Sequence, residues 1–267
     1  MKALKWPRLQ WRPHRSVRRL GAAFLLAGEV TFHLLRGRIS LRNSIEQMAL
    51  VGPASLSVAL VTAAFVGMVF TIQVAREFIA FGATSAVGGV LAIALVRELG
   101  PVLTAVVLAG RVGSAFAAEI GTMQVTEQID ALYMLGTDPV DYLVVPRFVA
   151  CVLMLPILNL LALVTGLWGG LMIADFLYGI PRGVYIESIQ NFLQPWDVWS
   201  SIIKSGIFGG VVAIIGCNWG MTTTGGAKGV GQSTTAAVVI SLLAIFILNF
   251  FLSWALFGGS SSLVPVL

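Results

Sequence analysis

Long runs without charged residues alternate with short polar segments along this chain. Glu46 and Arg76 bound one such run, and Arg147 and Asp175 bound another. The hydrocarbon core of a bilayer needs about 20 helical residues. We therefore predict an all-α integral membrane protein with five transmembrane helices, at approximately 47–75, 80–118, 148–174, 198–219 and 233–257.

Two features interrupt the helical pattern. Arg97-Glu98 and Gly100-Pro101 fall inside the second span, where a proline removes a backbone hydrogen bond and bends the helix. We expect one long, bent helix there, and we expect Gly52-Pro53 to mark the entry of the first span. The polar segment 175–197 is predicted to be a loop with a short helix at 183–192, and the Gly-rich segment 221–232 a second loop.

The N-terminal region has a different pattern. Residues 17–40 mix Arg18, Arg19, Glu29 and Arg36 with leucines and phenylalanines at helical spacing. This segment is too charged to span, so we predict an amphipathic helix lying in the membrane interface; a loosely bound amphipathic tail is the alternative. We divide the chain into a basic tail with an interfacial helix, 1–45, and a single transmembrane domain, 46–267.

Composition supports the membrane assignment. Hydrophobic residues make up 57% of the chain and charged residues 11%, against about 25% charged in soluble domains. The net charge of +5 is concentrated near the N-terminus, which is typical of a cytoplasmic membrane flank and not of a nucleic-acid surface. Ten basic residues lie in this region: Lys2, Lys5, Arg8, Arg12, Arg15, Arg18, Arg19, Arg36, Arg38 and Arg42.

This charge bias also predicts the topology. With the N-terminus in the cytoplasm, five spans place the C-terminus on the exoplasmic side and the 119–147 and 220–232 loops in the cytoplasm. The short N-terminus favours a bacterial inner (plasma) membrane over an organelle import precursor.

The chain carries few residues suited to catalysis. Cys151 and Cys217 fall in apolar runs, and His14 and His33 lie in the N-terminal region, so we predict no metal site and no catalytic residue. A GxxxxGK[ST] phosphate-binding motif is also absent from the sequence.

A short polar helix is predicted between the second and third spans. Thr126 can cap a helix that starts at Glu127, Gly136 suits its C-terminal end, and Asp138-Pro139 prevents continuation. Ile129, Leu132 and Tyr133 share one face by their spacing. This apolar face either folds back onto the protein's own bundle or inserts into a groove of another protein.

Two adjoining segments carry a specific resemblance. "RELGPVLTAVVLAGRVGSAFAAE" (97–119) and "EIGTMQVTEQIDALYMLGTDPVDYLVVPR" (119–147) resemble the signature of the MlaE/YrbE permease family, and the similarity extends from about Leu41 onward. Members of this family are membrane subunits of ABC-type phospholipid transporters that work with MCE-domain proteins. The resemblance implies a homodimer of five-span subunits, each with an interfacial helix, above a cytoplasmic ABC ATPase dimer.

The same resemblance implies the activity. The chain would move phospholipid or a related lipid between the plasma membrane and an exoplasmic MCE-domain protein facing 175–197, for outer-membrane lipid homeostasis. ATP and Mg²⁺ would bind the ATPase, leaving no cofactor and no enzymatic activity in this chain. Nucleic acid is not an expected partner.

The segment 124–137 is similar to the coupling helix of such transporters. Asp130-Ala131-Leu132 with Gly136 resembles the "EAA…G" spacing of ABC importers, although Asp and Leu replace the usual Glu and second Ala. The resemblance assigns ATPase coupling to this helix, with Glu127, Ile129, Asp130, Leu132, Tyr133, Gly136 and Asp138 as its candidate residues.

Arg97 and Glu98 are the candidates for a lipid cavity. A charge within a span costs several kcal/mol and usually faces a partner or a wet cavity. These residues either lie at the headgroup level or satisfy the broken helix near Pro101, or they line the lipid cavity and contact the phosphate or steer the headgroup. We interpret Lys204 and Arg76 as weaker candidates that extend toward the interface.

Two other classes of function compete with this interpretation. A stand-alone secondary transporter or channel for a small amphipathic solute would show internal repeats and ionisable residues at mid-span. An intramembrane enzyme would need a Ser/His pair, a metal cluster or paired carboxylates within the spans. The sequence shows no convincing sign of either.

Overall fold

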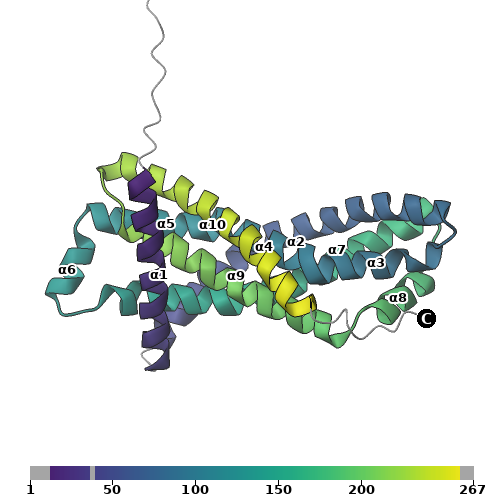
Figure 1. Ribbon diagram of the computed structural model, residues 1–267, viewed down its shortest axis with the longest axis horizontal. Helices are drawn as coiled ribbons and strands as arrows, with labels where there is room; N and C mark the ends of the chain where they lie inside the picture. The colour runs from purple at the N-terminus through teal and green to yellow at the C-terminus, as the bar shows by residue number, and fades with distance from the viewer. Residues whose placement is uncertain (1–12, 37–39, 259–267) are drawn as a thin grey trace, which may run out of the picture.

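The computed structural model describes residues 13–36 and 40–258 as an elongated bundle of helices (Figure 1). Five helices are long and apolar enough to cross a membrane, and a shorter helix precedes them. The long helices cover α2 (Leu41–Ala80), the composite helix Thr84–Val125, the helix Val140–Tyr178, α9 (Pro195–Met221) and α10 (Gly226–Phe257). The all-α fold with five candidate spans is thus confirmed.

The first long helix starts well before the predicted entry point. α2 is continuous from Leu41, and Pro53 lies inside it. Gly52-Pro53 therefore does not mark the start of the helix, which continues beyond the predicted span at both ends.

The second long helix contains two π-helical turns. It consists of η1 (Thr84–Ala86), α3 (Val87–Ala94), η2 (Leu95–Leu99), α4 (Gly100–Leu108), η3 (Ala109–Gly113) and α5 (Ser114–Val125). The π turn η2 directly precedes Pro101, at the beginning of α4. Since proline has no N–H to donate, the wider π turn is a natural place for the regular hydrogen-bond ladder to change.

The third long helix packs along the first through small residues. It comprises the π turn η4 (Val140–Val144) and α7 (Val145–Tyr178). Gly67 of α2 lies so close to Gly166 of α7 that a side chain at Gly67 would collide with the Gly166 carbonyl. Such close backbone approach gives membrane helices the van der Waals contact that holds them together.

The shorter helix α1 (Pro13–Leu35) crosses the bundle at a steep angle, near the end that carries α6 (Gln128–Met134) (Figure 1). Arg19 donates to the carbonyl of Thr222 at 2.9 Å, and Asn218 donates to the carbonyl of Arg19 at 2.9 Å. Leu26 and Val30 are buried in the main core. α1 is therefore a strap across the end of the bundle, an orientation expected of an interfacial helix.

The opposite end of the bundle carries α8 (Arg182–Phe192). Tyr185 is buried, and the hydroxyl of Ser188 accepts a hydrogen bond from the Gly89 N–H at 2.9 Å. The short helix predicted at 183–192 is confirmed. The loop predicted at 221–232 is shorter than expected, because α10 already begins at Gly226.

Candidate functional site

Four charged side chains meet between the second and fourth long helices. Arg97 and Glu98 come from η2, whereas Asp197 and Lys204 come from α9. Arg97 Nε lies 2.8 Å from Asp197 Oδ1, and Lys204 Nζ lies 3.0 Å from Glu98 Oε1. Arg97, Glu98, Asp197 and Lys204 are called the charged cluster below.

The last long helix completes the coordination of Glu98. Asn249 Nδ2 donates to Glu98 Oε2 at 2.8 Å, and the Ser253 hydroxyl donates to Glu98 Oε1 at 2.8 Å. The same hydroxyl accepts from Lys204 Nζ at 2.8 Å. The Phe257 ring lies 4.8 Å from the Arg97 guanidinium carbon, within cation–π range. The charged cluster therefore joins three of the long helices.

Burial divides the charged cluster into an inner and an outer half. Lys204 and Asp197 are completely or almost completely buried, whereas the side chains of Arg97 and Glu98 keep 32% and 41% of their exposure. An unpaired charge in this environment would cost several kcal/mol, so each buried charge has an opposite partner. Arg97 and Glu98 are thus the partly exposed members of the charged cluster.

Lys204 has a second contact that explains its position. Its ammonium donates to the main-chain carbonyl of Arg97 at 2.8 Å. Arg97 lies four residues before Pro101, which has no N–H to give that oxygen. Our interpretation that Lys204 extends toward the interface is therefore wrong, because the side chain is fully buried. Arg76, the other weak candidate, is exposed near the end of α2.

Asp197 was missed because we predicted 175–197 to be a loop. It occupies the first turn of α9, where its Oδ2 accepts from the Gln194 N–H at 3.0 Å in a capping box. The other oxygen is then free to bind Arg97. The sequence did carry a signal for this helix start: Pro195 is followed two positions later by the acidic Asp197.

The second group of candidates lies on α6 and its flanks. α6 begins at Gln128 and covers seven residues, so it is shorter than the predicted 124–137 helix. Thr126 does not cap it, because the Thr126 hydroxyl donates to the Thr122 carbonyl of α5 at 2.8 Å. Glu127 has a positive φ of 62° and is exposed. The chain turns sharply there, which ends α5 and reorients α6.

The C-terminal end of α6 forms as expected. Gly136 has φ 73°, the Gly136 N–H donates to Tyr133 O, and the Thr137 N–H donates to Leu132 O, both at 3.0 Å. These two bonds form a Schellman motif, which requires a left-handed residue and so favours glycine. Asp138 then accepts from the Val140 N–H at 2.9 Å and directs the chain into η4.

The side chains of α6 divide between the bundle and the exterior. Ile129 is buried and Leu132 packs against the main core, but Tyr133 is 57% exposed. The next two residues, Met134 and Leu135, are 89% and 79% exposed. One side of this helix therefore folds back onto the bundle, as the first alternative expected, and Tyr133, Met134 and Leu135 present an apolar surface outward. Asp130 is exposed.

Several carboxylates surround Tyr133 of α6. Partial burial raises the pKa of the Tyr133 phenol, and the negative charges of Asp138, Glu29 and Asp130 raise it further. Glu29 belongs to α1, so α1 and the α6 region contribute to one electrostatic environment.

An ion pair connects the two helices on either side of the α6 segment. Arg147 in α7 lies 2.9 Å from Glu119 in α5, and its other terminal nitrogen donates to the Leu143 carbonyl at 3.0 Å. Arg147 is buried, with its guanidinium carbon 5.4 Å from the Phe116 ring centre. The ion pair therefore joins α5 to α7 on either side of α6. The two helices and the Arg147–Glu119 pair are called the frame below.

The five long apolar helices define a multi-pass membrane protein, and comparison with known proteins identifies its family. Residues 44–255 match the family described as Permease MlaE. The chain belongs to this family of ABC transporter permeases and is not itself the catalytic ATPase.

Known relatives cover almost the whole chain. A probable ABC transporter permease protein of Synechocystis is 67% identical over 91% of this chain and 92% of its own length. The chloroplastic protein TRIGALACTOSYLDIACYLGLYCEROL 1 of Arabidopsis thaliana is 49% identical over 95% of this chain and 73% of its own length. A probable ABC transporter permease protein of Pyropia yezoensis is 44% identical over 95% of this chain.

Proposed function

We propose that this chain is the membrane subunit of an ATP-driven transporter that moves phospholipid or a related lipid. The observation that carries the proposal is the outward apolar surface of Tyr133, Met134 and Leu135, on a helix framed by the Arg147–Glu119 ion pair. An ABC permease needs such a surface, because the energy of ATP hydrolysis arrives from another polypeptide.

The α6 segment acts as the coupling element. Tyr133, Met134 and Leu135 dock into a groove of the ATPase, while Ile129 and Leu132 hold the helix to the bundle. Glu127, Asp130, Gly136 and Asp138 shape the segment and give its surface a negative charge. ATP and Mg²⁺ bind in the ATPase chain. Movement of the ATPase reaches the long helices through α5 and α7.

The charged cluster receives the lipid headgroup. The partly exposed Arg97 guanidinium can bind a phosphate with two parallel hydrogen bonds, and Glu98 can pair with a headgroup amine. The lipid assignment is supported by the name of the Arabidopsis relative, TRIGALACTOSYLDIACYLGLYCEROL 1, which is that of a glycerolipid.

The proposal extends to the orientation and the partners. The α1 and α6 end faces the cytoplasm and a dimer of ATPase subunits, and the α8 end faces an exoplasmic MCE-domain protein. Broad apolar faces on α2 and α10 remain exposed in the single chain, as expected if they meet lipid and a second copy of the chain. The membrane is the bacterial inner membrane, and the role is outer-membrane lipid homeostasis.

A co-purification experiment tests the coupling role. Met134→Asp places a charge in the exposed apolar surface without removing a core contact, so the ATPase should be lost at least tenfold while the chain still inserts. Ile186→Asp makes the same change at an exposed apolar position of α8, at the other end of the bundle, and should retain the ATPase. Full retention by Met134→Asp would refute the docking surface.

A further inference from the structure

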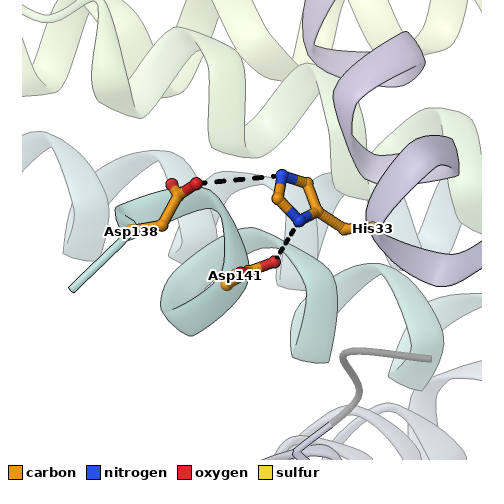
Figure 2. Close-up of side chains that lie close together, drawn as sticks. All are labelled: His33, Asp138 and Asp141. Atoms are coloured by element: carbon orange, nitrogen blue, oxygen red, sulfur yellow. Dashed lines mark ion pairs between the residues drawn. The ribbon is translucent and has the colours of Figure 1, made fainter. Parts of the chain in front are cut away.

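His33 of α1 lies between two carboxylates of the segment that follows α6 (Figure 2). Its Nδ1 is 2.6 Å from Asp141 Oδ1, and its Nε2 is 3.8 Å from Asp138 Oδ2. The His33 side chain is only 12% exposed, and that of Asp141 22% exposed. A titratable ring therefore forms part of the contact between α1 and the start of the third long helix.

The charge of the ring determines the strength of this contact. A neutral imidazole has one N–H, and its second nitrogen is an acceptor. An ionised carboxylate also only accepts, so the neutral ring can satisfy one of its two acidic neighbours and repels the other. The doubly protonated ring is a cation that attracts Asp141 and Asp138 at the same time, because each nitrogen lies beside a different carboxylate.

A shared metal ion is a different use of the same three residues, whose ligand atoms lie within 4.8 Å of one another. The geometry favours a proton. The contact of 2.6 Å between Nδ1 and Asp141 Oδ1 is shorter than the spacing of two ligand atoms on one tetrahedral Zn²⁺ ion, and the two carboxylates lie against opposite nitrogens of the ring (Figure 2). One ring nitrogen can bind a given metal ion, so the carboxylates would have to converge on one side.

Charged groups of the described chain lie about one turn to either side of His33. They are Glu29 on α1 and Arg36 directly after it, and Arg36 stacks over the Phe32 ring with its guanidinium carbon at 4.1 Å. On the facing elements, Asp130 and Asp138 lie near the Tyr133 phenol, and Arg147 of α7 is engaged by Glu119.

The contact fixes the second half of α1. The first half is already attached to the end of α9 by the Arg19–Thr222 and Asn218–Arg19 hydrogen bonds. Between these points Leu26 and Val30 are buried in the core that also holds Val140 and Val144. The His33 contact adds a polar attachment to this apolar packing.

We propose that His33, Asp138 and Asp141 form a proton-controlled latch between α1 and the segment that follows α6. Histidine gains its second proton within about pH 5 to 8, so the latch is closed at the acid end of this range and weakens as the pH rises. If the α6 segment couples to an ATPase as proposed above, the latch adjusts how firmly that segment is held.

Hydrogen–deuterium exchange tests the latch directly. The full-length chain in lipid nanodiscs is compared with His33→Gln and His33→Arg, each pair at the same pH, in the peptides that cover 24–35 and 138–147. At pH 5.5, His33→Gln should exchange about tenfold faster than the unaltered chain, the effect of losing a largely buried cation between two carboxylates. At pH 8 the two should agree within about twofold, because the unaltered latch has also opened.

His33→Arg keeps a cation with several donors, so it should remain protected at both pH values. The chain has two histidines, and His14→Gln is the matched control that should exchange like the unaltered chain. An equal acceleration by His33→Gln at both pH values would reduce His33 to a packing residue and overturn the proposal. Protection by added Zn²⁺ at pH 8 that disappears in His33→Gln would also overturn it, in favour of a metal site. Hydrogen–deuterium exchange reports on the contact between α1 and the segment after α6 directly. Its result therefore does not depend on whether the ATPase docks on α6.

Discussion

The ammonium of Lys204 donates to the main-chain carbonyl of Arg97, 107 residues away in the sequence, at 2.8 Å. This oxygen lies four residues before Pro101, which lacks the N–H that a regular helix would supply. The same ammonium binds Glu98 and Ser253. One buried side chain therefore donates to a carbonyl that Pro101 cannot serve, neutralises a carboxylate and joins three of the long helices.

Removing the Lys204 ammonium should destabilise the bundle strongly. Lys204→Met keeps most of the volume but leaves Glu98 without its cation, and the loss of one partner of a buried pair costs about 3–5 kcal/mol. Because Glu98 is partly exposed, we expect about 2 kcal/mol, measured as a lower midpoint of thermal unfolding in detergent.

Two further variants separate this effect from a general loss of charge. Lys228→Met removes an exposed lysine at the start of α10 and should leave the unfolding midpoint unchanged. Adding Glu98→Gln to Lys204→Met removes the unpaired charge and should recover part of the loss. Equal midpoints for Lys204→Met and Lys228→Met would show that the pair contributes nothing.

Arg97→Gln should impair lipid transfer more than assembly. The substitution removes the partly exposed cation that we propose for the headgroup phosphate. Lys204 and Glu98 stay paired, but Asp197 loses its cation, so transfer is compared at equal amounts of assembled transporter. Transfer of labelled phospholipid by the reconstituted transporter should fall at least tenfold, and Arg97→Lys should recover little, because lysine lacks the planar fork of donors. Arg76→Gln, at an exposed position near the end of α2, is the control. Unchanged transfer by Arg97→Gln would exclude Arg97 from the lipid site.

The sequence predicted the elements of this protein better than their contacts. The five spans follow from uncharged runs between Glu46 and the C-terminus, because the bilayer requires a minimum apolar length. The end of α6 followed from Gly136, since a left-handed residue in a Schellman motif favours glycine. Arg97 and Glu98 were recognised as unusual because charges within spans are costly.

The missing information was about partners far apart in the chain. Asp197 and Lys204 are separated from Arg97 and Glu98 by 100 or more residues, and no local pattern specifies that pairing. His33 was dismissed because neither histidine had a nearby ligand in sequence, whereas the fold brings Asp138 and Asp141 to both sides of its ring. The outward position of Met134 and Leu135 depends on the positive φ of Glu127, which is not a residue that usually adopts it.

Gly136→Ala should disturb the coupling segment locally. Gly136 has φ 73°, a conformation that costs a residue with a Cβ about 1 kcal/mol, and the strain would loosen the end of α6 next to Met134 and Leu135. We expect a few-fold weaker ATPase binding, measured as the concentration that half-saturates the complex. Gly110→Ala is the control, because Gly110 has open space around it and no positive φ. Equal binding by both variants would show that the geometry of this turn is unimportant.

Breaking the Arg147–Glu119 ion pair should separate ATP hydrolysis from transport. The pair joins α5 to α7 on either side of α6, and it lies inside the frame and not on the exposed docking surface. Glu119→Gln should therefore retain the ATPase and most of its turnover, while lipid transfer per ATP hydrolysed falls several-fold because the frame transmits movement less firmly. The carboxylate of Glu119 is about half exposed, so the stability cost should stay within about 1 kcal/mol.

Exchanging the two charges, in Glu119→Arg with Arg147→Glu, should restore part of the coupling if the attraction itself matters. A Glu119→Gln transporter with an unchanged ratio of lipid moved to ATP consumed would show that α5 and α7 transmit movement without this pair.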